Sequence, residues 1–183
     1  MSYHSSQSSG RTASVLNFLL TVFFAILFMV YFSLTAYTKD ALWFYSVFEG
    51  EPTLGVIRCY GTEVVLEQSS EQLQTISGLV NEQISGDKRW DELNLTDETY
   101  LDYQTNSRMM ILELYYDQPQ RIHSQSPFFS GFDTLLIPLD GRHSNTNILF
   151  NLVRGKPAGG SFHVETFAPV LEYIESSDLC KLQ

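Results

Sequence analysis

Three histidines beyond the N-terminal tail, His123, His143 and His163, are the side chains best suited to chemistry. His163 and Glu165 are two residues apart, so on a strand they would share a face. With His143 nearby, they would form a two-histidine, one-carboxylate metal site of the kind used by iron or zinc. The chain has no HExxH motif and no CxxC pair. We therefore expect no metal ion and no cofactor.

Asp140, His143 and Ser144 place an acid, a base and a hydroxyl within five residues. Nucleophilic catalysis requires such groups to converge in space, with the base oriented by a third group. Neighbouring positions of a tight turn point in different directions, and an Asp-Gly pair is typical of turns. The chain also lacks the GxSxG motif of a nucleophile elbow. We therefore expect turn residues here and no enzymatic activity.

Residues 154–160 (RGKPAGG) are rich in glycine, and such loops can expose N–H groups to a phosphate. The order of a P-loop is absent, however, and Pro157 removes one of the donors. We expect a loop between strands. Its Arg154 and Lys156 are basic in an acidic chain, which makes them candidate contacts with a partner.

Phe128, Phe129 and Phe132 surround Ser130 and Gly131 in another expected loop. Exposed aromatic side chains mark interfaces, so these three are also candidate interface residues. The alternative is that the loop folds back and the rings join the core.

Residues 15–37 form one apolar run without a charge, which is long enough to cross a bilayer as a helix. It is longer than the apolar part of a signal peptide, its end matches a cleavage site poorly, and aromatic residues follow it. We therefore predict an uncleaved, single-pass membrane anchor. The residues taken to hold it in the bilayer are Leu16, Phe23, Phe24, Phe28, Tyr37 and Trp43.

The run divides the chain into a polar, Ser-rich tail (1–14), the transmembrane helix (15–37), an aromatic juxtamembrane segment (38–50) and a soluble domain (51–183). We expect the tail to be disordered, because it has too few apolar groups to offset the ordering entropy. Only Arg11 of the 11 basic residues precedes the run, whereas all 21 acidic residues follow it. The acidic domain opposes binding to nucleic acid.

Arg11 on one side of the run is nearly balanced by Lys39 on the other, so the positive-inside rule gives little guidance. The short tail favours a cytoplasmic N-terminus and an extracytoplasmic domain; the single sequon at Asn94 would suit that orientation, but one sequon is expected by chance in a chain of this length. In an oxidising compartment, the only two cysteines, Cys59 and Cys180, would be free to pair. The alternative is two unrelated thiols.

The soluble domain has a pattern of short strands and a few helices. A hairpin is expected at 54–59 and 62–67, followed by a helix that begins near Ser69 and ends at Gly86. Further strands are expected at 108–116, 132–139, 147–153 and 161–165, with a short turn of helix near 97 and a closing helix at 167–176. Short turns between strands favour an antiparallel sheet, so the fold class is α+β with two or three helices.

A lone anchor and one compact domain are typical of an accessory or structural subunit. We expect such a domain to bind a neighbouring protein of a membrane assembly, because tethering raises the effective concentration of that partner. Its partners would be the lipid bilayer and other membrane protein subunits. Two alternatives stay open, a membrane-anchored sensor or regulator of a signalling protein and an anchored enzyme.

Overall fold

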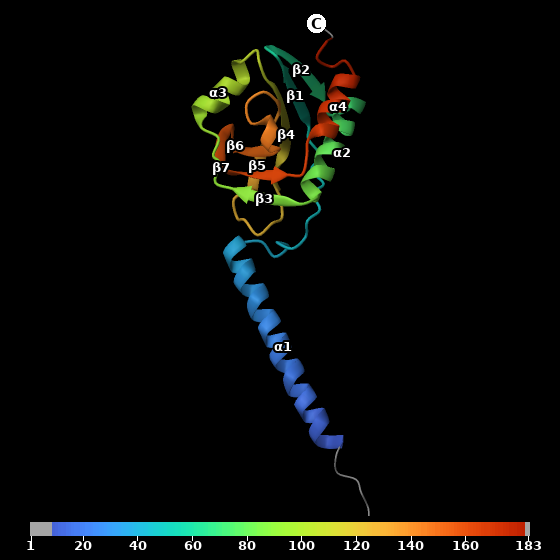
Figure 1. Cartoon of the computed structure of the whole chain (residues 1–183), viewed down its shortest axis with the longest axis vertical. Helices are drawn as coiled ribbons and strands as arrows, with labels where there is room; N and C mark the ends of the chain where they lie inside the picture. Colours follow the sequence, from blue (N-terminus) through green and yellow to red (C-terminus); the bar gives the residue numbers. More distant parts are fainter. Residues whose placement is uncertain (1–8, 182–183) are drawn as a thin grey trace, which may run out of the picture.

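A long helix, α1 (Ser9–Thr38), leads into a domain that contains all the other elements (Figure 1). The structure is a computed structural model that describes residues 9–181, and the side chains from residue 14 onward. The remaining helices are α2 (Glu71–Ser85), α3 (Asp97–Thr105), a 3-10 turn η1 (Ser144–Thr146) and α4 (Ala168–Ser176). The strands are β1 (Leu54–Cys59), β2 (Thr62–Glu67), β3 (Lys88–Asp91), β4 (Met110–Arg121), β5 (Ser130–Asp140), β6 (Ile148–Val153) and β7 (Lys156–Val164).

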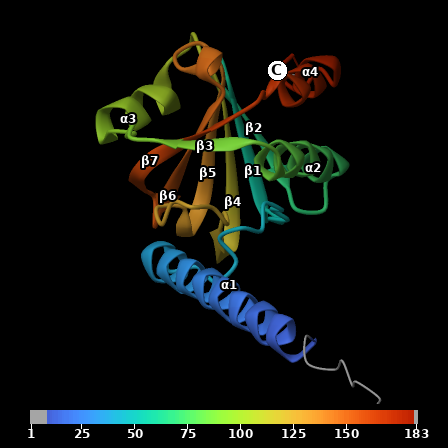
Figure 2. The same ribbon diagram turned by 60° about the horizontal axis from the view of Figure 1, so that its bottom comes forward.

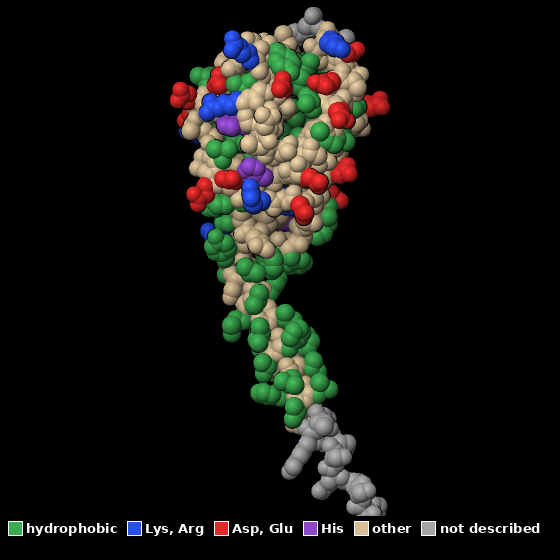
Figure 3. Space-filling model, in the orientation of Figure 1, with side chains coloured by type: hydrophobic (Ala, Val, Ile, Leu, Met, Phe, Trp, Pro, Cys, Tyr) green, Lys and Arg blue, Asp and Glu red, His purple; other side chains and the backbone are tan. Residues whose placement is uncertain are grey.

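Within α1, Ser14–Thr38 is long and apolar enough to cross a membrane, which indicates a membrane protein. These 25 residues correspond to about 38 Å of helix, against about 30 Å of hydrocarbon in a bilayer. Their side chains are exposed around the helix, in contrast to those of a core helix (Figure 3). Of the anchoring residues, Leu16, Phe23, Phe24 and Phe28 lie on this exposed surface.

The seven strands form one sheet in the order β2-β1-β4-β5-β6-β7-β3, and every neighbouring pair is antiparallel. The prediction of an α+β domain with a mostly antiparallel sheet is therefore confirmed. Figure 2 shows α2 and α4 on one side of the sheet and α3 on the other. The larger part of the core lies under α2 and α4, and a smaller part around Tyr103 and Phe150 lies under α3.

Helix α2 forms where the sequence predicts it. Its apolar side chains recur at helical spacing and are buried against the sheet: Leu73, Ile76, Val80 and Ile84. The N-cap is Ser70, one residue later than expected, because its Oγ accepts the N–H of Leu73 (3.2 Å). Gly78 in the middle of this helix is not closely packed, because nothing would lie within 4 Å of a Cβ at this position.

Three local expectations differ from the structure. Strand β4 does not stop at Pro119 but continues to Arg121 through a change of register between Tyr115 and Gln120. The expected loop at 154–160 is a tight turn followed by strand β7, because β6 supplies a pairing edge that the local sequence does not reveal. The short strand β3 was missed in a polar segment, and its Trp90 packs against Gly160 of β7.

Cys59, the last residue of β1, is joined by a disulfide bond to Cys180 near the C-terminus. The two residues are 121 positions apart in the sequence. Cys59 is buried in the core, and the segment after α4 therefore lies against the end of the sheet that is remote from α1 (Figure 1).

Candidate functional site

Asp140, His143 and Ser144, the acid, base and hydroxyl considered for catalysis, each contact a residue outside that group. Asp140 accepts the Tyr60 hydroxyl on Oδ2 (2.7 Å), and that hydrogen bond, with burial, raises the pKa of Tyr60 to about 12. Nδ1 of His143 instead contacts the Tyr103 hydroxyl, and Ser144 donates to the carbonyl of Gly141. Ser144, His143 and Asp140 therefore do not form a hydrogen-bonded triad in this structure.

His163 binds the carboxylate of Asp91 through Nε2 (3.1 Å) and contacts the Thr146 carbonyl through Nδ1 (2.9 Å). Burial and the nearby Arg142 charge lower the pKa of His143, which favours its neutral form. Within the described residues, no group of three or more His, Cys, Asp or Glu side chains is arranged to hold a metal ion.

The structure divides the candidate interface residues into two groups. Phe129 and Phe132 are fully buried in the core, so they cannot provide a surface contact. For these two residues the alternative applies, in which the loop folds back and the rings join the core. Phe128 is 49% exposed and its ring stacks on Trp90, 4.9 Å away. Arg154 and Lys156 flank the β6–β7 turn on the surface.

The junction between α1 and the domain contains a buried carboxylate. Asp40, two residues after α1, is 8% exposed, and its Oδ2 accepts a hydrogen bond from Nδ1 of His123 (2.8 Å). Arg121 places its guanidinium 3.7 Å from the same oxygen and donates to the Lys39 carbonyl (3.3 Å). Asp40, His123 and Arg121 are called the joint below. The joint connects the end of α1 to β4 and the loop after it.

The charge state of the joint follows from its contacts. Burial alone would raise the pKa of Asp40, but the hydrogen bonds from His123 and the Leu42 N–H, with the charges of His123 and Arg121, lower it overall. Asp40 is therefore ionised at neutral pH, and its carboxylate holds the side chains of His123 and Arg121 in place.

The segment between α1 and β1 is fixed to α2 over its second half. Ser85 accepts the Phe48 N–H (2.9 Å), and Ser77 and Asn81 both donate to the Gly50 carbonyl (3.1 and 3.0 Å). Lys88 donates to the carbonyls of Ser46 (3.0 Å) and Ile84 (2.9 Å). Gly50 is required here, because a Cβ would lie 2.5 Å from the buried ring of Phe48. Residues 46–50 therefore have a fixed position against the domain, and they are called the mount from here on.

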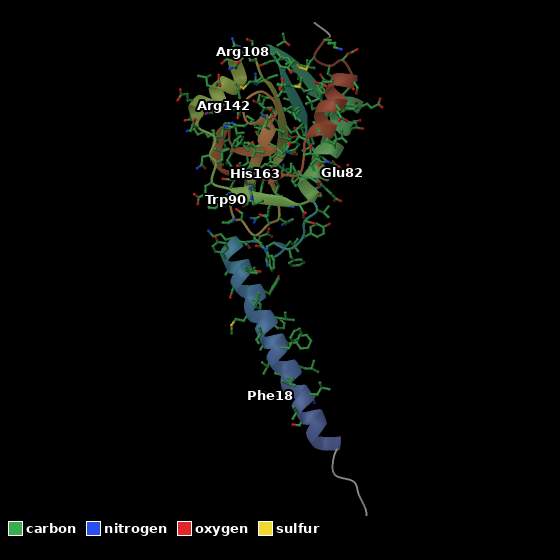
Figure 4. All side chains as sticks on the ribbon, in the orientation of Figure 1. Phe18, Glu82, Trp90, Arg108, Arg142 and His163 are labelled. Carbon is green, nitrogen blue, oxygen red and sulfur yellow. A yellow bond between two sulfur atoms is a disulfide. The ribbon has the colours of Figure 1, made fainter. Side chains whose placement is uncertain are left out.

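A groove of about 640 Å³ opens beside the joint, at the end of the domain next to α1. Its walls come from the end of α1 (Tyr37), the following segment (Trp43, Phe44), residues 86–90 and the loop 123–128. Figure 4 shows Trp90 at this end of the domain and Arg108 at the opposite end. Tyr37 and Trp43, which the sequence predicts as anchor residues, thus line this cavity.

The groove combines aromatic rings with hydrogen-bond donors. Lys88, Arg89 and His123 line it, and Asp87 is the acidic residue among its walls. Burial lowers the pKa of Lys88 in spite of the Asp87 charge. The indole N–H of Trp43 is buried and has no hydrogen-bond acceptor among the described residues. The groove was not predicted, because its walls come from four segments that only the fold brings together.

The groove is the candidate binding site in the described part of the chain, and no group of potential metal ligands is found among the described residues. Comparison of the chain with protein-family models, with curated proteins and with solved structures finds no match.

Proposed function

We propose that the protein is a single-pass, membrane-anchored accessory subunit whose extracytoplasmic domain binds a neighbouring membrane protein. The observation that carries this proposal is the joint. Because Asp40, His123 and Arg121 fix the end of α1 to the domain, the domain keeps one orientation above the bilayer. A subunit that presents a defined surface to a neighbour in the same membrane needs such a fixed orientation.

The same contacts support retention of α1 as an anchor. The Thr38 side chain is buried and donates to the Leu34 carbonyl (2.8 Å), and Tyr31 within α1 donates to the Ala41 carbonyl (3.2 Å). Removal of the helix would leave Asp40 without part of the structure that encloses it. An anchor that stays in the mature protein agrees with this packing.

The Cys59–Cys180 disulfide supports an extracytoplasmic domain. Disulfides persist in oxidising compartments and are rare in the cytosol. The short N-terminal tail would then lie in the cytoplasm. Protease added to sealed, right-side-out membranes should digest the domain, and a fully protected domain would reverse the orientation.

The sheet offers a surface for the partner at the β2 edge. Strand β2 pairs with β1 alone and ends the sheet, so one edge of its backbone is open to a further strand. Val65 of β2 is 57% exposed on the face that carries α3. Glu63 and Glu67 lie on the same face of β2, and Glu63 is paired with Arg58 of β1. The charge of Glu67 favours a basic or polar partner surface.

The experiment is affinity purification of the full chain from native membranes after mild detergent extraction. We expect membrane proteins to co-purify, and the Val65→Lys variant to lose them. Leu101→Lys is the matched control, because Leu101 is similarly exposed (60%) but lies on α3. A chain that is monomeric and free of other proteins at every detergent strength would contradict the proposal.

The sensor or regulator alternative also draws on the joint, because a rigid connection is able to transmit a change in the domain to α1. It predicts that exchanging α1 for an unrelated apolar helix abolishes function while the domain stays folded. An accessory subunit should retain partner binding after the same exchange.

A further inference from the structure

We propose that the groove beside the joint binds the headgroup of an anionic phospholipid from the adjacent leaflet. The inference rests on α1 crossing the membrane, as in the proposed function, but it does not depend on a protein partner. Four observations carry it: the depth of the groove relative to α1, its basic walls, its aromatic residues and its size.

The depth follows from the length of α1. About 20 helical residues fill the hydrocarbon core, and a span centred within Ser14–Thr38 leaves that core near residue 36. Tyr37 lines the groove immediately after this point, and Trp43 and Phe44 follow. The groove therefore opens in the headgroup layer, where the phosphates of neighbouring lipids lie.

The charge of the groove differs from that of the chain, which has a formal net charge of −10. Lys88 and Arg89 contribute two positive charges, and Asp87 contributes one negative charge. His123 binds Asp40 through Nδ1, and its Nε2 has no hydrogen-bond partner within the described residues. Salt screens the remaining acidic surface beyond about 8–10 Å, so the local basic residues determine which headgroup binds.

The donors of the groove suit a phosphate. Arg89 forms no ion pair with any described residue, and Lys88 keeps one of its three N–H groups after donating to two carbonyls. A phosphate oxygen is an acceptor for both of these side chains, whereas water alone would leave the cationic walls uncompensated.

The aromatic walls suit the boundary between glycerol and headgroup. Trp43, Phe44, Trp90 and Phe128 provide apolar ring surface beside polar tips, the combination that favours membrane interfaces. A cavity of about 640 Å³ lies within the usual range of ligand sites, about 300–1,000 Å³. A single headgroup therefore fits, and its acyl chains would lie along α1.

The test uses intrinsic fluorescence, because both tryptophans of the chain, Trp43 and Trp90, line the groove. Full-length protein in neutral detergent is titrated with dihexanoyl phosphatidylglycerol, a short-chain anionic lipid. We expect a saturable change in emission, and a weaker or absent change with dihexanoyl phosphatidylcholine. Inorganic phosphate is the third probe, and an equal response to it would overturn the proposal in favour of a free-anion site.

Arg89→Gln removes a charge from the groove while β3 keeps its backbone pairing with β7. We expect about fivefold weaker binding of the anionic lipid, since one basic residue near a membrane surface contributes about 1 kcal/mol. Arg142→Gln is the matched control, because its side chain is 53% exposed and lies away from the groove. Circular dichroism confirms that both variants fold.

Equal affinity for the two lipids, or an Arg89→Gln variant with unchanged affinity, would overturn the proposal. A change in tryptophan emission that appears only when another membrane protein binds would also overturn it, because the groove would then be a protein contact. The measurement uses the isolated full chain. Failure to find a protein partner would therefore contradict the proposed function and leave lipid binding standing.

Discussion

Reduction of the Cys59–Cys180 disulfide should destabilise the domain strongly, because the bond closes most of its chain. The two cysteines are 121 positions apart. In the chain-entropy treatment, a loop of this length lowers the entropy of the unfolded chain by about 16 cal/mol/K, which stabilises the folded state by about 5 kcal/mol at 25 °C. With an unfolding entropy of about 2.1 cal/mol/K per residue over residues 51–183, the melting temperature should fall by about 18 °C.

The assay is thermal unfolding of the full chain in detergent, followed by near-ultraviolet circular dichroism with and without a phosphine reductant. A double variant, Cys59→Ser with Cys180→Ser, is the control. Its melting temperature should be insensitive to the reductant and close to that of the reduced protein. The reasoning is refuted if reduction lowers the melting temperature by less than about 3 °C, which corresponds to about 1 kcal/mol for a domain of this size.

Three further sets of substitutions test the joint, the aromatic residues Phe128 and Phe129, and Gly50 of the mount. Asp40→Asn should remove the charge that Arg121 and His123, both partly exposed, contact, and should destabilise the junction by about 1 kcal/mol, measured by limited proteolysis after α1. Because the folded pKa of Asp40 is lowered, its contribution should persist above pH 3.8 and be lost as the pH falls further, in the same assay. Phe129→Ala should lower the free energy of unfolding by about 3–5 kcal/mol, and Phe128→Ala should lower it much less, as measured by urea unfolding. Gly50→Ala should destabilise the domain, whereas Gly78→Ala should stabilise it by about 1 kcal/mol in the same measurement.

Each of these expectations has a contradicting result. If the segment after α1 resists proteolysis equally well in Asp40→Asn and in the unaltered protein, the joint contributes little to the position of α1. Equal costs at Phe128 and Phe129 would contradict the buried placement of the second ring. A stable Gly50→Ala variant would show that Phe48 moves aside, so that the mount is softer than its contacts indicate.

Local signals in the sequence were sufficient for much of the fold. The apolar run predicts α1, and the two β-rich segments on either side of Tyr60 and Gly61 predict the β1–β2 hairpin with the bounds observed. Thr96 caps α3 as its side-chain chemistry indicates. These elements depend on residues that are close together in the chain, so the sequence pattern contains the information that determines them.

The features that escaped prediction depend on distant residues. Strand β3 is only four residues long and forms by pairing with β7, which follows it by more than sixty residues. The joint joins Asp40 to a histidine 83 positions away, and no spacing rule connects them. The groove combines four such segments. Among the predicted interface residues, only burial in the finished fold separates Phe128 from Phe129.

The position of the disulfide also determines how the domain would respond to mechanical load. The chain enters the domain at the α1 end, and the last described residues lie at the opposite pole (Figure 1). A pull applied beyond Cys180 would pass through the sulfur bridge into β1, which is hydrogen-bonded on both sides. Residues 60–179, helix α4 among them, lie inside the closed loop and are shielded from that force. Traction from a partner attached beyond Cys180 would therefore run along the backbone of β1 to α1, and it would reach the bilayer without shearing the sheet or peeling away the closing helix.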